Sequence, residues 1–171
     1  MKNLLRLTLI LGLFFGGLAT VGAQDYSSSV GLRLGAPASI SYKMFLGGGS
    51  NAIEAFASYR RRSYLSSYNW TQIGIGAGYQ IHKDIPSVDG LMWYFGAGAS
   101  VFFWNYSDAV YFGDASTTSF GILGFLGLDY AFSDVPVNLS IDWVPTFFIN
   151  GYTNGFGAGG GALSVRYILG R

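Results

Sequence analysis

Apolar residues alternate with small or polar residues along most of the chain, with a period of two. In the segment 90–104, for example, Trp93, Phe95 and Val101 fall on one face, whereas Gly96 and Ser100 fall on the other. Successive residues of a strand point to opposite sides of a sheet, so this pattern predicts strands with one apolar face. We expect eight of them, at residues 28–35, 38–46, 51–61, 68–81, 90–104, 118–132, 135–149 and 158–169.

Seven charged residues inside these segments fall on the face opposite to the apolar one. A soluble sandwich also alternates, but here the apolar faces are long and uncharged. An arginine or lysine on the lipid face of a membrane barrel costs about 2–4 kcal/mol at the midplane, so this pattern indicates an outside in contact with lipid. The sequence therefore predicts an all-β protein, folded as an eight-stranded antiparallel up-and-down transmembrane β-barrel.

The interior of such a barrel is only just wide enough for its own side chains, and buried charges need partners. We therefore expect the inward charges to form a lumen ion-pair network. A catalytic carboxylate cluster and the wall of a pore are the alternative interpretations. The network residues are Arg33, Lys43, Glu54, Arg60, Asp129, Asp142 and Arg166.

Several glycines face inward on the fourth and fifth predicted strands. In an eight-stranded barrel these strands lie across from the eighth and the first, which carry two inward arginines. We expect the glycines to make room for the arginine side chains, with a small water-filled hollow as the alternative. The glycines are Gly74, Gly76, Gly78, Gly96 and Gly98, and the arginines are Arg33 and Arg166.

An even number of strands places both ends of the barrel domain on one side of the membrane. For a secreted chain this side is the periplasm, and the longer loops lie outside. We expect extracellular loops at 36–37, 62–67, 105–117 and 150–157, and periplasmic turns at 47–50, 82–89 and 133–134.

Residues 1–23 have the features of a cleaved secretory signal peptide. Lys2 and Arg6 form a basic start, residues 4–18 an apolar core, and residues 21–23 a small-residue cleavage site. A retained membrane anchor is the alternative, although the apolar stretch is short for one. We expect residues 24–171 to form the outer-membrane β-barrel domain and to reach the outer membrane by secretion.

The composition of the chain argues against several kinds of binding and catalytic site. Ten basic residues face nine acidic ones, which gives no indication of nucleic-acid binding. The absence of cysteine excludes a disulfide framework, a thiol nucleophile and a thiolate metal site. A serine–histidine–acid triad would depend on His82, which is the only histidine and which we expect in a periplasmic turn. We predict no catalytic residues, no cofactor and no metal site.

Three consecutive arginines, Arg60 to Arg62, fall at the predicted outer rim. They could contact lipopolysaccharide phosphates through charge-assisted hydrogen bonds. The alternative is a solvated start of a loop.

The chain resembles the small outer-membrane β-barrel proteins of the OmpA/OmpX-like superfamily, in particular the short barrels of Bacteroidota-type bacteria. The resemblance is carried by residues 30–35, 40–43, 127–130, 135–143 with Pro145, and 163–167. It implies the barrel fold and says little about activity, because barrels of this size include plugs, adhesins, lipid enzymes and proteins without an assigned role.

These observations predict a monomeric integral outer-membrane protein with a structural or surface-interaction role, exerted through its extracellular loops and without catalysis. Outer-membrane lipid and lipopolysaccharide are the expected partners, together with a surface ligand or protein. A narrow passive pore, an outer-membrane lipid-modifying enzyme and a soluble lipocalin-like carrier are the alternatives. The expected contact anchors in the loops are Tyr106, Tyr111, Phe112 and Tyr152.

Overall fold

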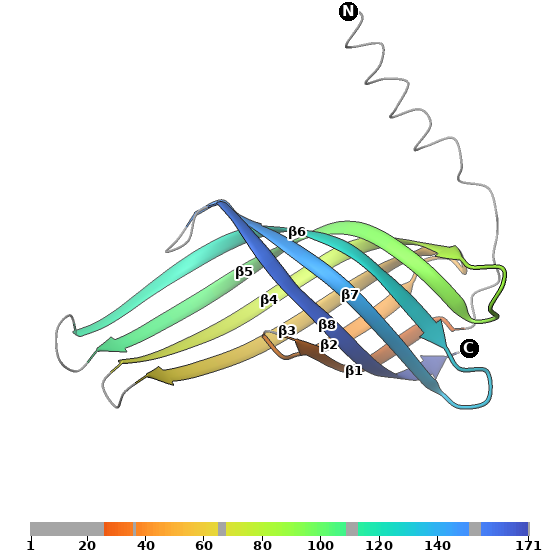
Figure 1. The fold of residues 1–171 in the computed structure, drawn as a ribbon, viewed down its shortest axis with the longest axis horizontal. Helices are drawn as coiled ribbons and strands as arrows, with labels where there is room; N and C mark the ends of the chain where they lie inside the picture. Colours follow the sequence, from red (N-terminus) through yellow and green to blue (C-terminus); the bar gives the residue numbers. More distant parts are fainter. Residues whose placement is uncertain (1–25, 36, 65–67, 109–112, 151–154, 171) are drawn as a thin grey trace, which may run out of the picture.

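A computed structural model describes residues 26–35, 37–64, 68–108, 113–150 and 155–170. The strands join in sequence order, each antiparallel to the next, and β1 pairs with β8 to close a barrel (Figure 1). This confirms the predicted eight-stranded all-β fold. The strands are β1 (Ser28–Gly35), β2 (Ser39–Phe45), β3 (Asn51–Tyr64), β4 (Tyr68–Asp84), β5 (Leu91–Asp108), β6 (Gly113–Ala131), β7 (Val137–Phe148) and β8 (Gly155–Gly170).

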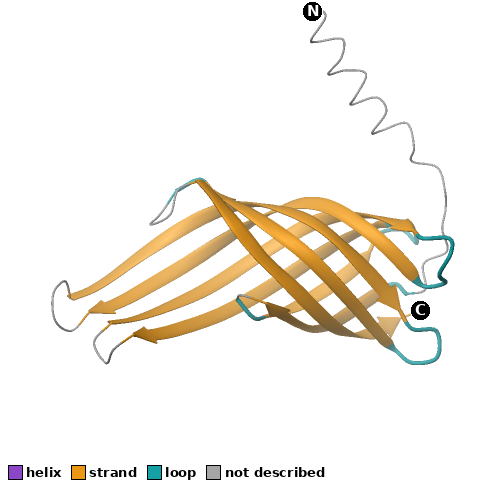
Figure 2. Ribbon diagram, viewed as in Figure 1, coloured by secondary structure: helices purple, strands orange, loops and turns teal. Residues whose placement is uncertain are grey.

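The described part of the chain consists of strands and short connections (Figure 2). It includes no helix that is long and apolar enough to cross a membrane.

The outside of the barrel is apolar. None of the outward positions predicted from the alternation is buried, and Ile40 and Phe120 are 60% and 51% exposed. The described in-strand charges of the network, by contrast, lie on the inner face, and most are fully enclosed. A soluble carrier would bury its apolar face around a ligand, so this arrangement is the reverse of a lipocalin-like fold and is that of a barrel with a lipid-facing exterior.

The two ends of the barrel differ in their connections. Ser28 of β1 pairs with Gly170 of β8, and the turns 46–50, 85–90 and 132–136 lie at the same end. We call this end the base and the opposite end the rim. At the rim, β3 to β6 run well beyond β1 and β2 and form a projecting sheet, seen at the left of Figure 1.

The predicted loops 62–67 and 105–117 are wrong over the residues that the structure describes, which are 62–64, 105–108 and 113–117. Strand pairing continues through both regions, as in the pairs Arg62↔Trp70 and Tyr106↔Ala115. The outward positions there are polar, as at Ser63, Asn105 and Ser116, so the alternation loses its apolar half although the backbone ladder goes on. Residues 65–67 and 109–112, which connect these strands, lie outside the described residues.

The predicted position of His82 in a turn is also wrong. β4 extends to Asp84, so the turn begins later than expected and His82 faces the lumen, where it is fully buried.

The apolar exterior ends abruptly at one level on three neighbouring strands. Tyr59, Ile73 and Phe103 are aligned across β3, β4 and β5 and form its last row. The next outward row consists of Arg61, Thr71 and Asn105. This change from apolar to polar marks the rim-side boundary of the lipid-facing band.

Candidate functional site

The lumen near the base is filled by a network of charged and polar side chains centred on Glu54 of β3. Arg33 of β1 donates a hydrogen bond from Nη1 to Glu54 Oε1 over 2.9 Å, and Arg166 of β8 donates from Nη2 to the same oxygen. Gln80 of β4 donates to the second oxygen, Oε2, over 2.7 Å. Strands β1, β4 and β8 are thereby joined to β3 through one carboxylate.

Arg33 extends this network toward β7. Its Nη2 donates to Asp142 Oδ1 over 2.9 Å, and the Tyr94 hydroxyl donates to the other oxygen of Asp142. Asp142 and Tyr94 are both buried. The hydrogen bonds to the two oxygens of the Asp142 carboxylate compensate for the water that these oxygens lose on burial.

A second cluster lies around Asp129 of β6, closer to the base. Lys43 Nζ donates to Asp129 Oδ2 over 2.8 Å, and the Tyr26 hydroxyl donates to Oδ1 over 3.1 Å. Asn138 donates to the same carboxylate and accepts from Arg166 Nη1 over 3.3 Å. Asn138 therefore connects this cluster to the one around Glu54.

The network is balanced in charge. It contains three cations and three carboxylates, and each carboxylate accepts at least one hydrogen bond from a cation. Removal of one partner from a buried pair costs about 3–5 kcal/mol, because an uncompensated charge remains. These carboxylates are already engaged, so the arrangement is suited to bracing and filling the lumen. No cluster of three or more metal-ligating side chains occurs among the described residues.

The structure brings six of the seven expected residues together and leaves Arg60 apart. Arg60 lies six positions beyond Glu54 on β3, about 20 Å along the strand. Its guanidinium carbon lies 5.3 Å from the centre of the Trp70 ring, within the projecting sheet. The prediction that Arg60 faces inward was correct, but Arg60 lies farther toward the rim than the network.

Sequence reasoning missed the neutral members of the network. Tyr26, Gln80, Tyr94 and Asn138 all donate to its carboxylates. The alternation could have identified Gln80, Tyr94 and Asn138, because each lies at an inward-facing position of its strand. Tyr26 precedes β1, so no alternation marks it.

His82 is held among aromatic rings beside the second cluster. It stacks on Tyr94 with ring centroids 4.8 Å apart, and Phe45 meets it edge-on at the same distance. Its Nε2 lies 3.4 Å from Lys43 Nζ. The ring is thus packed inside the lumen, next to Lys43 of the second cluster.

The inward glycines of β4 accommodate phenylalanine rings, so the expectation that they make room for arginines is wrong. A Cβ at Gly76 would lie 2.5 Å from the ring of Phe56, and one at Gly74 would meet the Phe102 ring. Phe125, from β6, occupies the space above Gly78.

The glycines of β5 are required for a different reason than those of β4. At Gly96 and Gly98 an added Cβ would collide with backbone carbonyls of β4. The close approach of two strands, rather than a side chain, requires glycine there.

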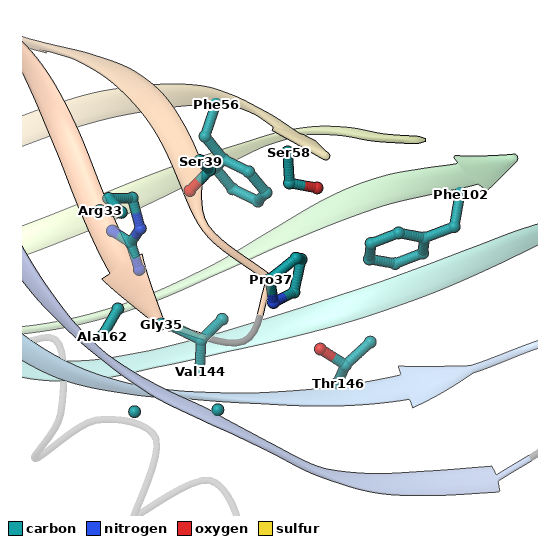
Figure 3. Close-up of a pocket in the computed structure, with 12 residues that line it drawn as sticks. Arg33, Gly35, Pro37, Ser39, Phe56, Ser58, Phe102, Val144, Thr146 and Ala162 are labelled. Carbon is teal, nitrogen blue, oxygen red and sulfur yellow. The ribbon is translucent and has the colours of Figure 1, made fainter. Parts of the chain in front are cut away.

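A small hollow of about 80 Å³ lies on the rim side of Arg33 (Figure 3). Its walls include Ser39, Phe56, Phe102 and Thr146, so it is part polar and part aromatic. A space of this size holds a few water molecules, and Arg33 is the network residue among those that line it.

Aromatic side chains line the inner face of the projecting sheet. Trp70 and Trp104 have ring centroids 5.4 Å apart, and Tyr106 stacks on Trp104 at 6.2 Å. Of the four expected loop anchors, Tyr106 is therefore a strand residue. The other three, Tyr111, Phe112 and Tyr152, lie outside the described residues.

The fold is similar to that of two solved outer-membrane barrels. Neisserial surface protein A aligns with a TM-score of 0.56 and 17% identity, over 83% of this chain and 94% of that protein. Ail, the attachment invasion locus protein of Yersinia pestis, aligns with a TM-score of 0.53 and 11% identity, over 82% and 95%. No protein-family model matches the sequence, and no curated protein matches it significantly. The similarity confirms the fold of the OmpA/OmpX-like group of small barrels.

Proposed function

We propose that this protein is a monomeric integral protein of the bacterial outer membrane, delivered by the signal peptide 1–23, with a plugged lumen and a surface-interaction role exerted by its projecting sheet. The observation that carries this proposal is the apolar exterior that ends in one row at Tyr59, Ile73 and Phe103, with the sheet continuing beyond it. A band of this kind fits a bilayer, and whatever projects past it meets solvent.

The orientation follows from the positions of the two ends. The base holds the start of β1 and the end of β8, so a chain delivered by secretion places the base in the periplasm. The projecting sheet then lies on the cell surface. The names of the two similar barrels, a surface protein and an attachment protein, support a role of this general kind.

The projecting sheet also has two strand edges that the rest of the barrel leaves uncovered. β2 pairs with β3 only as far as Ser58, and β7 pairs with β6 only from Gly121 onward. Beyond these points the backbone groups of β3 and β6 on one side have no neighbouring strand among the described residues. Such edges can accept a strand from another protein, so they extend the predicted role of the loops to the strands that carry them.

The ion-pair network supports a non-catalytic role and argues against the alternative of a narrow pore. It spans the lumen from β1 to β3, β7 and β8 with direct hydrogen bonds. The catalytic alternative is disfavoured by His82, which is enclosed between Phe45 and Tyr94 at the periplasmic end. We expect no single-channel conductance in a planar bilayer and unchanged lipid A mass spectra on overexpression.

Cysteine labelling tests the orientation directly, because the chain contains no cysteine of its own. In intact cells, a membrane-impermeant maleimide should label Asn105→Cys in the projecting sheet. The matched control is Ser87→Cys in the turn 85–90 at the base, which should react only after the outer membrane is opened. Labelling of Ser87→Cys in intact cells, with Asn105→Cys protected, would overturn the proposed orientation.

A further inference from the structure

The outer wall of the barrel has a large groove, formed where β1, β2 and β3 meet near the rim. It has a volume of about 500 Å³, within the range of sites that hold drug-sized ligands. Leu32, Leu34, Ile40 and Tyr59 form its sides, and all four are more than half exposed. Ala57 pairs with Ile40 on one side and with Ile75 on the other. Because its side chain is small, a trough remains between these larger side chains.

The groove lies just inside the boundary of the lipid-facing band, and a positive charge lies just outside it. Arg61 follows Tyr59 by two positions on β3, so both side chains point outward on the same face. The Arg61 side chain is exposed, and no side-chain hydrogen bond or ion pair joins it to any residue that the structure describes. On its other side no described strand pairs with Arg61, because the pairing of β2 with β3 reaches only Ser58, so that strand edge is open among the described residues.

An apolar groove alone does not select one lipid from a bilayer, because lipid tails are as apolar as leucine. Selection needs a polar contact at the headgroup level. A guanidinium there fits a phosphate, which it can bind through two parallel hydrogen bonds. The groove and Arg61 together therefore match a lipid that has a phosphate at its headgroup and an acyl chain directly beneath it.

We infer that this face of β1 to β3 binds one lipid A molecule of the surrounding leaflet, with an acyl chain along Ala57 and a phosphate on Arg61. The inference rests on the proposed function, which places the rim at the outer leaflet, where the phosphorylated lipid is lipid A. Several acyl chains share one lipid A headgroup, so one chain occupies the groove while the others remain in the bilayer. The site would fix the position of the barrel relative to its lipid neighbours.

The test uses the protein folded in the outer membrane and purified in detergent micelles. Native mass spectrometry measures the retention of added diphosphoryl lipid A and, separately, of phosphatidylglycerol. Arg61→Gln should weaken lipid A retention about fivefold, as expected for one arginine at a charged interface. Ala57→Leu, which fills the trough, should weaken it by at least as much.

Two matched controls separate the site from general effects. Arg62→Gln removes the same charge from the next residue, which faces the inner side of the projecting sheet. Ala99→Leu makes the same change at an outward position of β5, away from the groove. Both should retain lipid A as the unaltered protein does.

Equal retention by all four variants would overturn the inference, and so would retention of phosphatidylglycerol as strong as that of lipid A. Each variant is first tested for recovery from the outer-membrane fraction and for a mobility shift on boiling. Absence of the unaltered protein from that fraction would overturn the proposed function as well, whereas normal recovery with no lipid A selectivity overturns this inference alone.

Discussion

The base and the rim of this barrel are filled by opposite means. At the base, charged side chains from six strands (β1, β2, β3, β6, β7 and β8) are joined by hydrogen bonds around Glu54 and Asp129. Toward the rim, phenylalanine rings lie against glycines, as Phe56 does on Gly76. The base depends on electrostatic pairs that tolerate no missing partner, whereas the rim depends on matched volumes.

The largest effect is expected at the centre of the base. Glu54→Ala leaves both Arg33 and Arg166 without the carboxylate oxygen that they share, so it should lower the free energy of unfolding by about 3–5 kcal/mol. Denaturant unfolding in detergent micelles, followed by tryptophan fluorescence, measures this change. Asp134→Ala, in an exposed turn at the base, is the control and should change stability by less than about 0.5 kcal/mol. A loss below about 1 kcal/mol for Glu54→Ala would contradict the conclusion that the network makes the main electrostatic contribution to stability.

A smaller effect is expected from overpacking above the base. Gly76→Ala places a methyl group against the Phe56 ring and should cost about 1–3 kcal/mol in the same unfolding experiment.

The double variant Gly76→Ala with Phe56→Leu identifies the cause of that loss. If the glycine accommodates the ring, the second substitution should cost less in the Gly76→Ala background than in the unaltered protein. Strictly additive losses would show that Gly76 serves some other purpose.

The smallest effect is expected where a charge lies outside the network. Arg60→Gln removes a contact with the Trp70 ring in the projecting sheet, which is worth about 0.5–1 kcal/mol at an exposed site. The same substitution at Arg33 should be several times more costly, because Arg33 bridges Glu54 and Asp142. Equal losses at the two arginines would contradict the division between base and rim.

The strands and the inward charges could be predicted from the sequence because each carries a local marker. A period of two assigns every residue to a face, and the cost of a charge in lipid identifies which face is inside. Lys43 and Asp129 were placed on the lumen side in this way, and they meet there.

The features that could not be predicted depend on contacts between distant segments. Phe125 of β6 reaches Gly78 of β4, which no local pattern records. His82 looked like a turn residue because two charged residues, Lys83 and Asp84, follow it in the sequence. Only the pairing with β5 shows that β4 continues to Asp84. The projecting sheet was read as loops for a related reason: outside the lipid-facing band a strand has no need of apolar residues.

The central claim is that the chain forms a closed outer-membrane barrel. The most direct test compares unboiled and boiled samples of the outer-membrane fraction on a detergent gel. Our account predicts that the protein is found in this fraction and that its mobility changes on boiling, because the closed ladder of eight strands resists detergent until it is heated. Recovery in the soluble secreted fraction, with the same mobility before and after boiling, would contradict it.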